Sequence, residues 1–205
     1  AFAAALGTGL PVYEPQGSFV VDIGGGTTEV ALVSMGGVVL SHSIRVAGNK
    51  IDEAISGFLK KQHAILVTDR VAEQIKFDLA DVRSDKKMEH IAVVRGRDIA
   101  TGMPLTVDVD MSKVSEAIHE PLQEILGAIK WVLGRVPPEL CSDILQNGIY
   151  LTGGSAALPN LDTMIATEFG VPVSVARDAG ECTTLGAGYM ADHFDMLGGV
   201  IGKAE

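Results

Sequence analysis

Cysteine, aromatic residues and long apolar runs are all scarce in this sequence, and each shortage excludes a class of protein. The 205 residues hold two cysteines, Cys141 and Cys182, which form no disulfide framework and match no metal or redox spacing. The five histidines show no paired ligand spacing, which argues against a zinc site or a histidine-dependent triad. No apolar run approaches the roughly 20 residues that cross a membrane. We therefore expect a protein of a reducing compartment with two structural thiols.

Basic residues are also in deficit. Lys and Arg number 16 against 26 Asp and Glu, which gives a formal net charge of −10. This charge argues against a nucleic-acid partner and fits a soluble cytoplasmic protein. An apolar fraction of 47% excludes a disordered chain. The length is that of one large domain or two small ones.

The pattern of apolar residues predicts a mixed α/β fold. Residues 18–23, 27–33 and 38–46 read as three strands of a meander, with a glycine-rich first bend. Helical spacing follows in several later segments, and Pro121 should split or kink the helix expected over 111–133. Trp131 lies on that apolar helix, so we expect it in the core. The stretch from about 67 to 110 is the most charged and looks like an insertion into a β–α core.

The strongest candidate for chemistry is residues 21–30, with the sequence VDIGGGTTEV. Gly24, Gly25 and Gly26 let successive backbone N–H groups approach an anion without a Cβ in the way. Thr27 and Thr28 would add hydroxyl donors. Asp22 would lie at the same end of the strand as this loop. A carboxylate beside a polyphosphate is expected to hold magnesium, through water. This segment predicts a phosphate-binding loop.

Two further segments are weaker when taken alone. Residues 148–158 (GIYLTGGSAAL) run from a strand through Gly153, Gly154 and Ser155 into a helix, which places backbone N–H groups at one edge of a sheet. Such turns are also common as plain structure. Residues 72–76 (AEQIK) read by themselves as an ordinary helix surface.

The order of these segments resembles the actin-like ATPase superfamily and, within it, the bacterial MreB family. The resemblance rests on the two glycine motifs, an Ala-Gly pair before a helix, the AEQIK segment, and the segments 95–104 and 136–140 outside the nucleotide motifs. It spans the whole chain. It implies an α/β fold of the actin-like ATPase (ribonuclease H-like) type, present as one lobe with a small α+β inserted subdomain. Residues 1–66 and 111–205 would form subdomain IIA, and residues 67–110 subdomain IIB.

The resemblance also implies roles for single residues. Residues 22–28 would be the second phosphate loop of an ATP or ADP site, with Asp22 near Mg²⁺. Glu73 would contact the ribose and Lys76 would lie near the base. Gly153, Gly154 and Ser155 would form the adenosine loop, and residues 185–188 would belong to the second helix that connects two lobes.

The sequence departs from the usual MreB pattern in places. Residues 47–50 (AGNK) replace Gly-Gly-Asp-Glu, although Asp52 is kept. Gln74 stands where the family commonly has a second Glu, and Ser155 stands where the family often has Gly. No first phosphate loop is found, and the chain opens just after the point where the family places its catalytic Glu. The resemblance thus implies a carboxy-terminal lobe with no catalytic residue of its own. Alone, it should bind ATP weakly or not at all and hydrolyse none.

The function implied is that of an ATP-dependent, filament-forming bacterial actin, concerned with cell shape or with positioning an organelle such as a magnetosome. Its partners would be other filament protomers and the absent amino-terminal lobe, which would also make any membrane contact. Two alternatives remain open: the lobe of a sugar or acid kinase of the same superfamily, and a non-catalytic actin-like scaffold.

Overall fold

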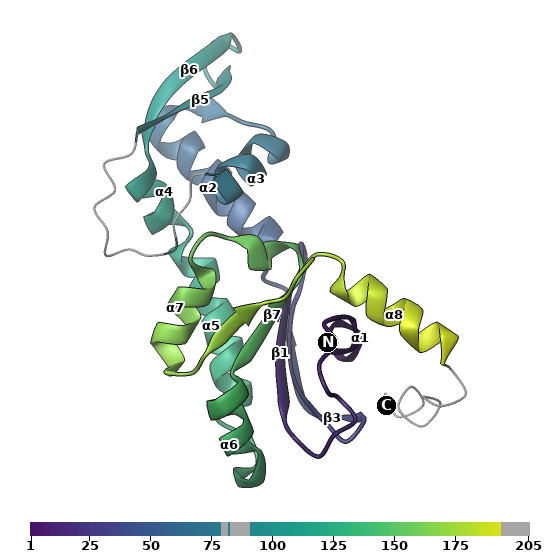
Figure 1. Cartoon of the computed structure of the whole chain (residues 1–205). Coiled ribbons are helices and arrows are strands. Elements are labelled where there is room, and N and C mark those ends of the chain that lie inside the picture. The colour runs from purple at the N-terminus through teal and green to yellow at the C-terminus, as the bar shows by residue number, and fades with distance from the viewer. Residues whose placement is uncertain (79–81, 83–90, 194–205) are drawn as a thin grey trace.

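The computed structural model describes residues 1–78, 82 and 91–193 and contains two β-sheets joined by long helices (Figure 1). The larger sheet has five strands in the order β3-β2-β1-β7-β8, and the smaller has three in the order β4-β5-β6. Over these residues, no helix is both long enough and apolar enough to cross a bilayer.

The larger sheet contains the predicted meander. Strands β1 (Ser18–Ile23), β2 (Thr28–Ser34) and β3 (Gly37–Ile44) pair antiparallel in sequence order. Strands β7 (Ile149–Thr152) and β8 (Val173–Val175) then continue the sheet in parallel with β1. Because β1 and β7 are parallel neighbours, the loops that follow them meet at the same edge of the sheet.

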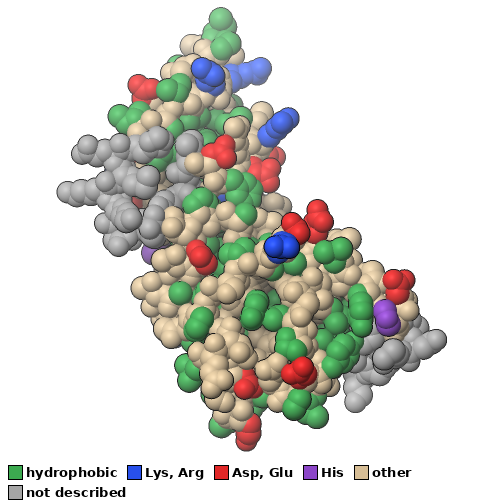
Figure 2. All heavy atoms as spheres, viewed as in Figure 1, with side chains coloured by type: hydrophobic (Ala, Val, Ile, Leu, Met, Phe, Trp, Pro, Cys, Tyr) green, Lys and Arg blue, Asp and Glu red, His purple; other side chains and the backbone are tan. Residues whose placement is uncertain are grey.

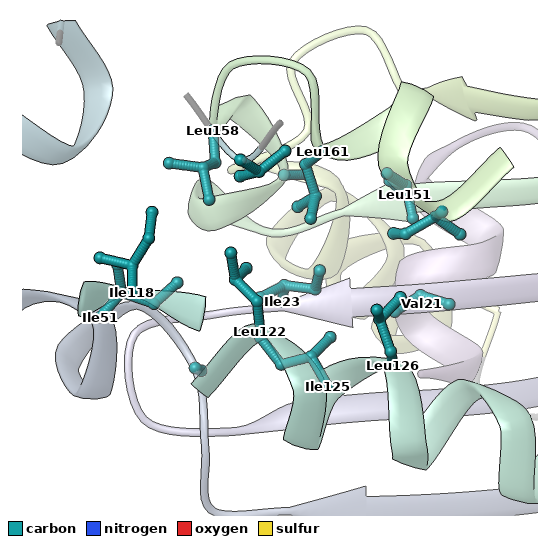
Figure 3. Close-up of a cluster of buried hydrophobic side chains, with 14 of the residues drawn as sticks. Val21, Ile23, Ile51, Ile118, Leu122, Ile125, Leu126, Leu151, Leu158 and Leu161 are labelled. Carbon is teal, nitrogen blue, oxygen red and sulfur yellow. The ribbon is translucent and has the colours of Figure 1, made fainter. Parts of the chain in front are cut away.

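Helices cover both faces of this sheet. One face packs against α5 (His119–Leu133), α6 (Pro138–Asn147) and α7 (Leu161–Phe169), and the other against α1 (Phe2–Gly7) and α8 (Cys182–Asp192). Along β1, Val21 and Ile23 face α5, and Val20 faces α1. Figure 3 shows Val21 and Ile23 among buried side chains of α5 and of the segments near Leu151 and Leu158.

The smaller sheet is built from β4 (Ile65–Leu66), β5 (Ile91–Asp98) and β6 (Pro104–Asp110), all antiparallel. It packs beside α2 (Gly48–His63), α3 (Asp69–Asp78) and α4 (Met111–Ala117). The sheet begins at Ile65, two residues before the expected start of the insertion. Its buried residues Val94 and Val109 belong to the same apolar cluster as the larger sheet, so one core runs through both parts.

The helix expected over 111–133 is split, as Pro121 predicted. The break falls at Ile118, and Pro121 lies in the first turn of α5, where its missing N–H removes no helical hydrogen bond. Helix α6 was not predicted; it begins at Pro138, and proline is well suited to the first position of a helix.

Trp131 is a correction to the sequence analysis. Its side chain is 38% exposed and stacks on His42 of β3, with ring centroids 4.6 Å apart. The Arg135 guanidinium lies 3.9 Å from the centroid of the indole ring. The apolar stripe of α5 is buried, whereas Trp131 lies off that stripe, against the edge strand β3, where a large ring is only partly covered.

Charge is unevenly distributed on the surface. On the face drawn in Figure 2, most Lys and Arg side chains lie over the part that contains the smaller sheet, whereas acidic side chains are spread over both parts. The exposed Arg95 and Arg97 belong to β5.

Candidate functional site

Three predicted segments meet where β1 and β7 end. Asp22 and Thr152 are partners in the parallel register of the two strands, and each strand runs directly into a glycine-rich loop. The start of α2 closes the third side, because its first amides bond to the loop after β1. Ligands of open α/β sheets bind at this carboxyl edge.

The loop over 24–27 rests on the beginning of α2. The amides of Gly48 and Asn49 donate to the carbonyl oxygens of Gly24 and Gly25, at 3.1 and 2.8 Å. The Gly24 amide closes the turn by donating to Thr27, at 3.0 Å. Gly25, Gly26 and Thr27 are exposed, and their own amides donate to no residue in the described part of the chain. These free N–H groups are the donors that an anion would meet.

The second loop follows β7 as a short 3-10 turn, η1 (Gly154–Ala157). Gly153 precedes it with a φ of +85°, and an added Cβ would overlap the carbonyl of Ile23 and reach the Asp22 carboxylate. Glycine is therefore required here both for its conformation and for its size. The Gly153 amide donates to Ala179, at 2.8 Å, and Gly154 is exposed at the mouth.

One carbonyl oxygen ties the three segments together. Gly24 O accepts from the Gly48 amide and also from Ser155 Oγ, at 2.8 Å. Ser155 is buried, so its hydroxyl acts between the two glycine loops rather than toward the opening.

Ser155→Ala should lower the free energy of unfolding by about 1 kcal/mol, the typical value of one internal hydrogen bond. The loss stays modest because the Gly48 amide still satisfies Gly24 O. Urea unfolding measures it, and Ser41→Ala on an exposed position of β3 is the control, expected to change stability by less than about 0.5 kcal/mol. Equal effects of both substitutions would contradict a bond between the loops.

Lys76 is buried where α3 meets the beginning of α2. Its side chain is buried, and Nζ lies 3.0 Å from Asp52 Oδ1 and 3.1 Å from Oδ2, with Gly48 O at 3.5 Å. Lys76 therefore joins α3 to the first turns of α2. Burial raises the pKa of the Asp52 carboxyl above its ordinary value, and the hydrogen bond from Lys76 acts in the opposite direction.

Thr28 is a second correction. Its side chain is fully buried, and its hydroxyl donates to the Val46 carbonyl at 2.7 Å, so it has no proton left to give a phosphate. The residue belongs to β2, where alternation turns it inward. Thr27 and Glu73, by contrast, are exposed, the latter on α3.

Asp22 is half-buried, and its two oxygens have different surroundings. Oδ2 accepts a hydrogen bond from Thr183 Oγ1 at 2.7 Å, and Oδ1 lies on the side of Gly153. A single carboxylate with free lone pairs, beside a loop of free amides, suits a Mg²⁺ ion that keeps most of its waters. The residues present therefore fit Mg²⁺ bound together with a phosphate. The ion would neutralise the negative charges of the phosphate and of Asp22.

Sequence reasoning missed the partners of the predicted residues. Thr183 had no role, and Asp52 was noted only as a retained residue. No local pattern marks either one, because the bonds to Asp22 and Lys76 span 161 and 24 positions. The Ala-Gly pair before α2 was a usable signal, since Gly48 leaves room for Ser155 and Lys76: an added Cβ would overlap Ser155 Oγ.

Comparisons with known proteins agree on one family. A family model described as MreB/Mbl protein matches residues 1–199. The chain is 44% identical to the cell shape-determining protein Mbl of Bacillus subtilis, over 95% of this chain and 58% of that protein. It is also 44% identical to MreB of Escherichia coli, over 99% and 58%. The chain thus spans somewhat more than half the length of the curated relatives it matches.

Solved structures agree with this result. The crystal structure of MreB5 of Spiroplasma citri bound to AMPPNP matches with a TM-score of 0.87 at 32% identity, over 96% of this chain and 59% of that one. The MamK double helical filament matches with a TM-score of 0.71 at 22% identity, a likeness of fold alone. With a family model that covers nearly its whole length, the chain belongs to the MreB/Mbl family and has an actin-like ATPase fold.

Proposed function

We propose that this chain supplies one side of a Mg²⁺–ATP or Mg²⁺–ADP site in a filament-forming bacterial actin. The observation that carries the proposal is the convergence of two glycine loops and the start of α2 on Gly24 O. Beside it lie the exposed residues Gly25, Gly26 and Thr27, whose amides donate to no residue in the described part of the chain. Solved structures of MreB5 bound to AMPPNP and ADP support it.

Each part of the site has a proposed task. The loop over 24–27 binds the terminal phosphates through its amides, and Asp22 binds Mg²⁺ through water. Gly153 and Gly154 lie against the adenosine, and Glu73 on α3 contacts the ribose. Lys76 and Ser155 hold these segments in place from behind. A second lobe supplies the other phosphate loop and the catalytic Glu.

The wider assignments belong to the same proposal. Residues 1–66 and 111–205 form subdomain IIA and residues 67–110 form subdomain IIB, a division supported by the two separate sheets. The protein works in the cytoplasm as a polymer of its own copies, consistent with the filament structure of MamK. Any membrane contact is made by the second lobe.

The test is a titration of the ¹⁵N-labelled chain with Mg²⁺–ADP, followed by NMR. We expect amide shifts at 24–27, at 153–155 and near Glu73, with a dissociation constant in the millimolar range, about −4 kcal/mol. Half a site leaves most of the nucleotide in water, which is why the affinity is low. Phosphate release from Mg²⁺–ATP should stay at the level of buffer.

Gly26→Asp is the variant that removes binding. An added Cβ at Gly26 meets nothing within 4 Å, so the substitution puts a carboxylate at the mouth without a clash. Gly57→Asp in α2 makes the same charge change, also in open space, and should bind as the wild type does. Shifts that survive in Gly26→Asp, or that lie away from both loops, would contradict the proposed site.

A further inference from the structure

Thr183 joins the end of β1 to the beginning of α8. It is the second residue of α8, and its Oγ1 donates to Asp22 Oδ2 at 2.7 Å. The side chain is exposed, so neither a buried core nor a helix cap accounts for its position. Within residues 1–78, 82 and 91–193, this is the one hydrogen bond that the Asp22 side chain makes.

The strand pattern explains why Asp22 meets α8. Val20 of β1 packs toward α1, and Asp22, two residues later, lies on the same face of the sheet. Thr152 is its parallel partner on β7, and its buried hydroxyl has no hydrogen-bond partner in the described structure. Two threonines therefore flank Asp22, but only Thr183 bonds to it.

Helix α8 is itself held firmly. One turn after Thr183, Gly186 lies so close to α1 that an added Cβ would overlap the carbonyl of Ala3, and Gly7 makes a similar approach to Cys182. Thr183 is thus presented to Asp22 by a helix with little freedom to shift. A hydroxyl donor on one oxygen fixes the rotation of the carboxylate and leaves its negative charge unchanged.

We infer that Thr183 is a positioning residue for Mg²⁺. It orients Asp22 toward the hydrated ion. Because Thr183 is held by the packing of α8 on α1, the affinity for Mg²⁺ depends on that packing. Groups that orient a metal ligand strongly affect metal affinity even though they do not touch the ion. The inference rests on the proposed function and adds a residue outside both glycine loops.

The experiment compares Thr183→Val, Thr183→Ser and Thr152→Val by the same NMR titration with ADP, once with Mg²⁺ and once with EDTA. Thr183→Val should weaken binding about tenfold with Mg²⁺ and less than about twofold without it. Thr183→Ser keeps the hydroxyl and should restore the affinity. Thr152→Val removes a hydroxyl beside Asp22 that makes no bond and should leave the Mg²⁺ dependence unchanged.

Several results would overturn the inference. If Thr183→Val lost the same ADP affinity with and without Mg²⁺, the role of Thr183 would be structural only. If Thr183→Ser bound no better than Thr183→Val, the hydroxyl would not be the group that matters. If the wild-type chain bound ADP with no effect of Mg²⁺, the inference would fail while the nucleotide site stood. If the wild-type chain bound no nucleotide at all, the proposed function would fail and the inference with it.

Discussion

Lys76→Met should lower the free energy of unfolding by about 3–5 kcal/mol, the usual effect of removing one partner of a buried ion pair. Only 3% of the Lys76 side chain and 16% of the Asp52 side chain are exposed. Methionine keeps the packing along the lysine stem but leaves the Asp52 carboxylate buried without its cation. Urea unfolding followed by circular dichroism measures the loss.

The chain offers a matched control in α2, the helix that carries Asp52. Lys50 pairs with Glu53 at 2.6 Å, but these side chains are 53% and 63% exposed. Lys50→Met should therefore change stability by less than about 1 kcal/mol. The double variant Lys76→Met with Asp52→Leu should recover most of the loss, because no buried charge remains. A similar loss in Lys50→Met and Lys76→Met would show that burial of the pair is not the cause.

The effect of Lys76→Met should also depend on pH. Burial raises the folded-state pKa of Asp52 above 3.8, against the influence of Lys76. A raised pKa means that the folded state holds the proton more tightly, so the stability present at low pH is lost as pH rises through that pKa. Without Lys76 the pKa rises further. The deficit of the variant should therefore be small near pH 4 and grow toward about pH 7.

Much of the fold could be predicted because its signals are local. The strand over 18–23 is observed with those bounds as β1. The helix split at Ile118 follows from the ring of Pro121, which a first helical turn accepts and a helix interior does not. The two glycine loops were found because each directly follows an apolar strand. These features depend on residues that are neighbours in the sequence.

The rest depends on which segments meet, and no local pattern carries that information. Thr28 and Thr27 have the same chemistry, yet strand alternation buries one and exposes the other. The sequence pattern around Lys76 is that of a helix surface, but in the structure α2 places Asp52 Oδ1 3.0 Å from Lys76 Nζ. Ser155 was seen as a departure from a family pattern, but its hydrogen bond to Gly24 crosses 131 positions. The loops were predictable, whereas the bonds that join them were not.

Gly186→Ala should destabilise the chain by about 3 kcal/mol, at the upper end of the usual effect of overpacking. Helices α1 and α8 cross with their backbones in contact, and an alanine methyl at this position would overlap the Ala3 carbonyl. The helices can relieve the overlap only by separating. Separation would expose Phe2, Ala4 and Ala5, which are buried against the sheet.

Gly188→Ala in the same helix separates this effect from helix propensity. Gly188 is exposed, and an added Cβ meets nothing within 4 Å, so alanine should raise stability by up to about 1 kcal/mol. Thermal unfolding should therefore move in opposite directions for two identical substitutions one half-turn apart. If both stabilised the chain, α1 would not be packed on α8 in solution, and Thr183 would lose the rigid support on which its bond to Asp22 depends.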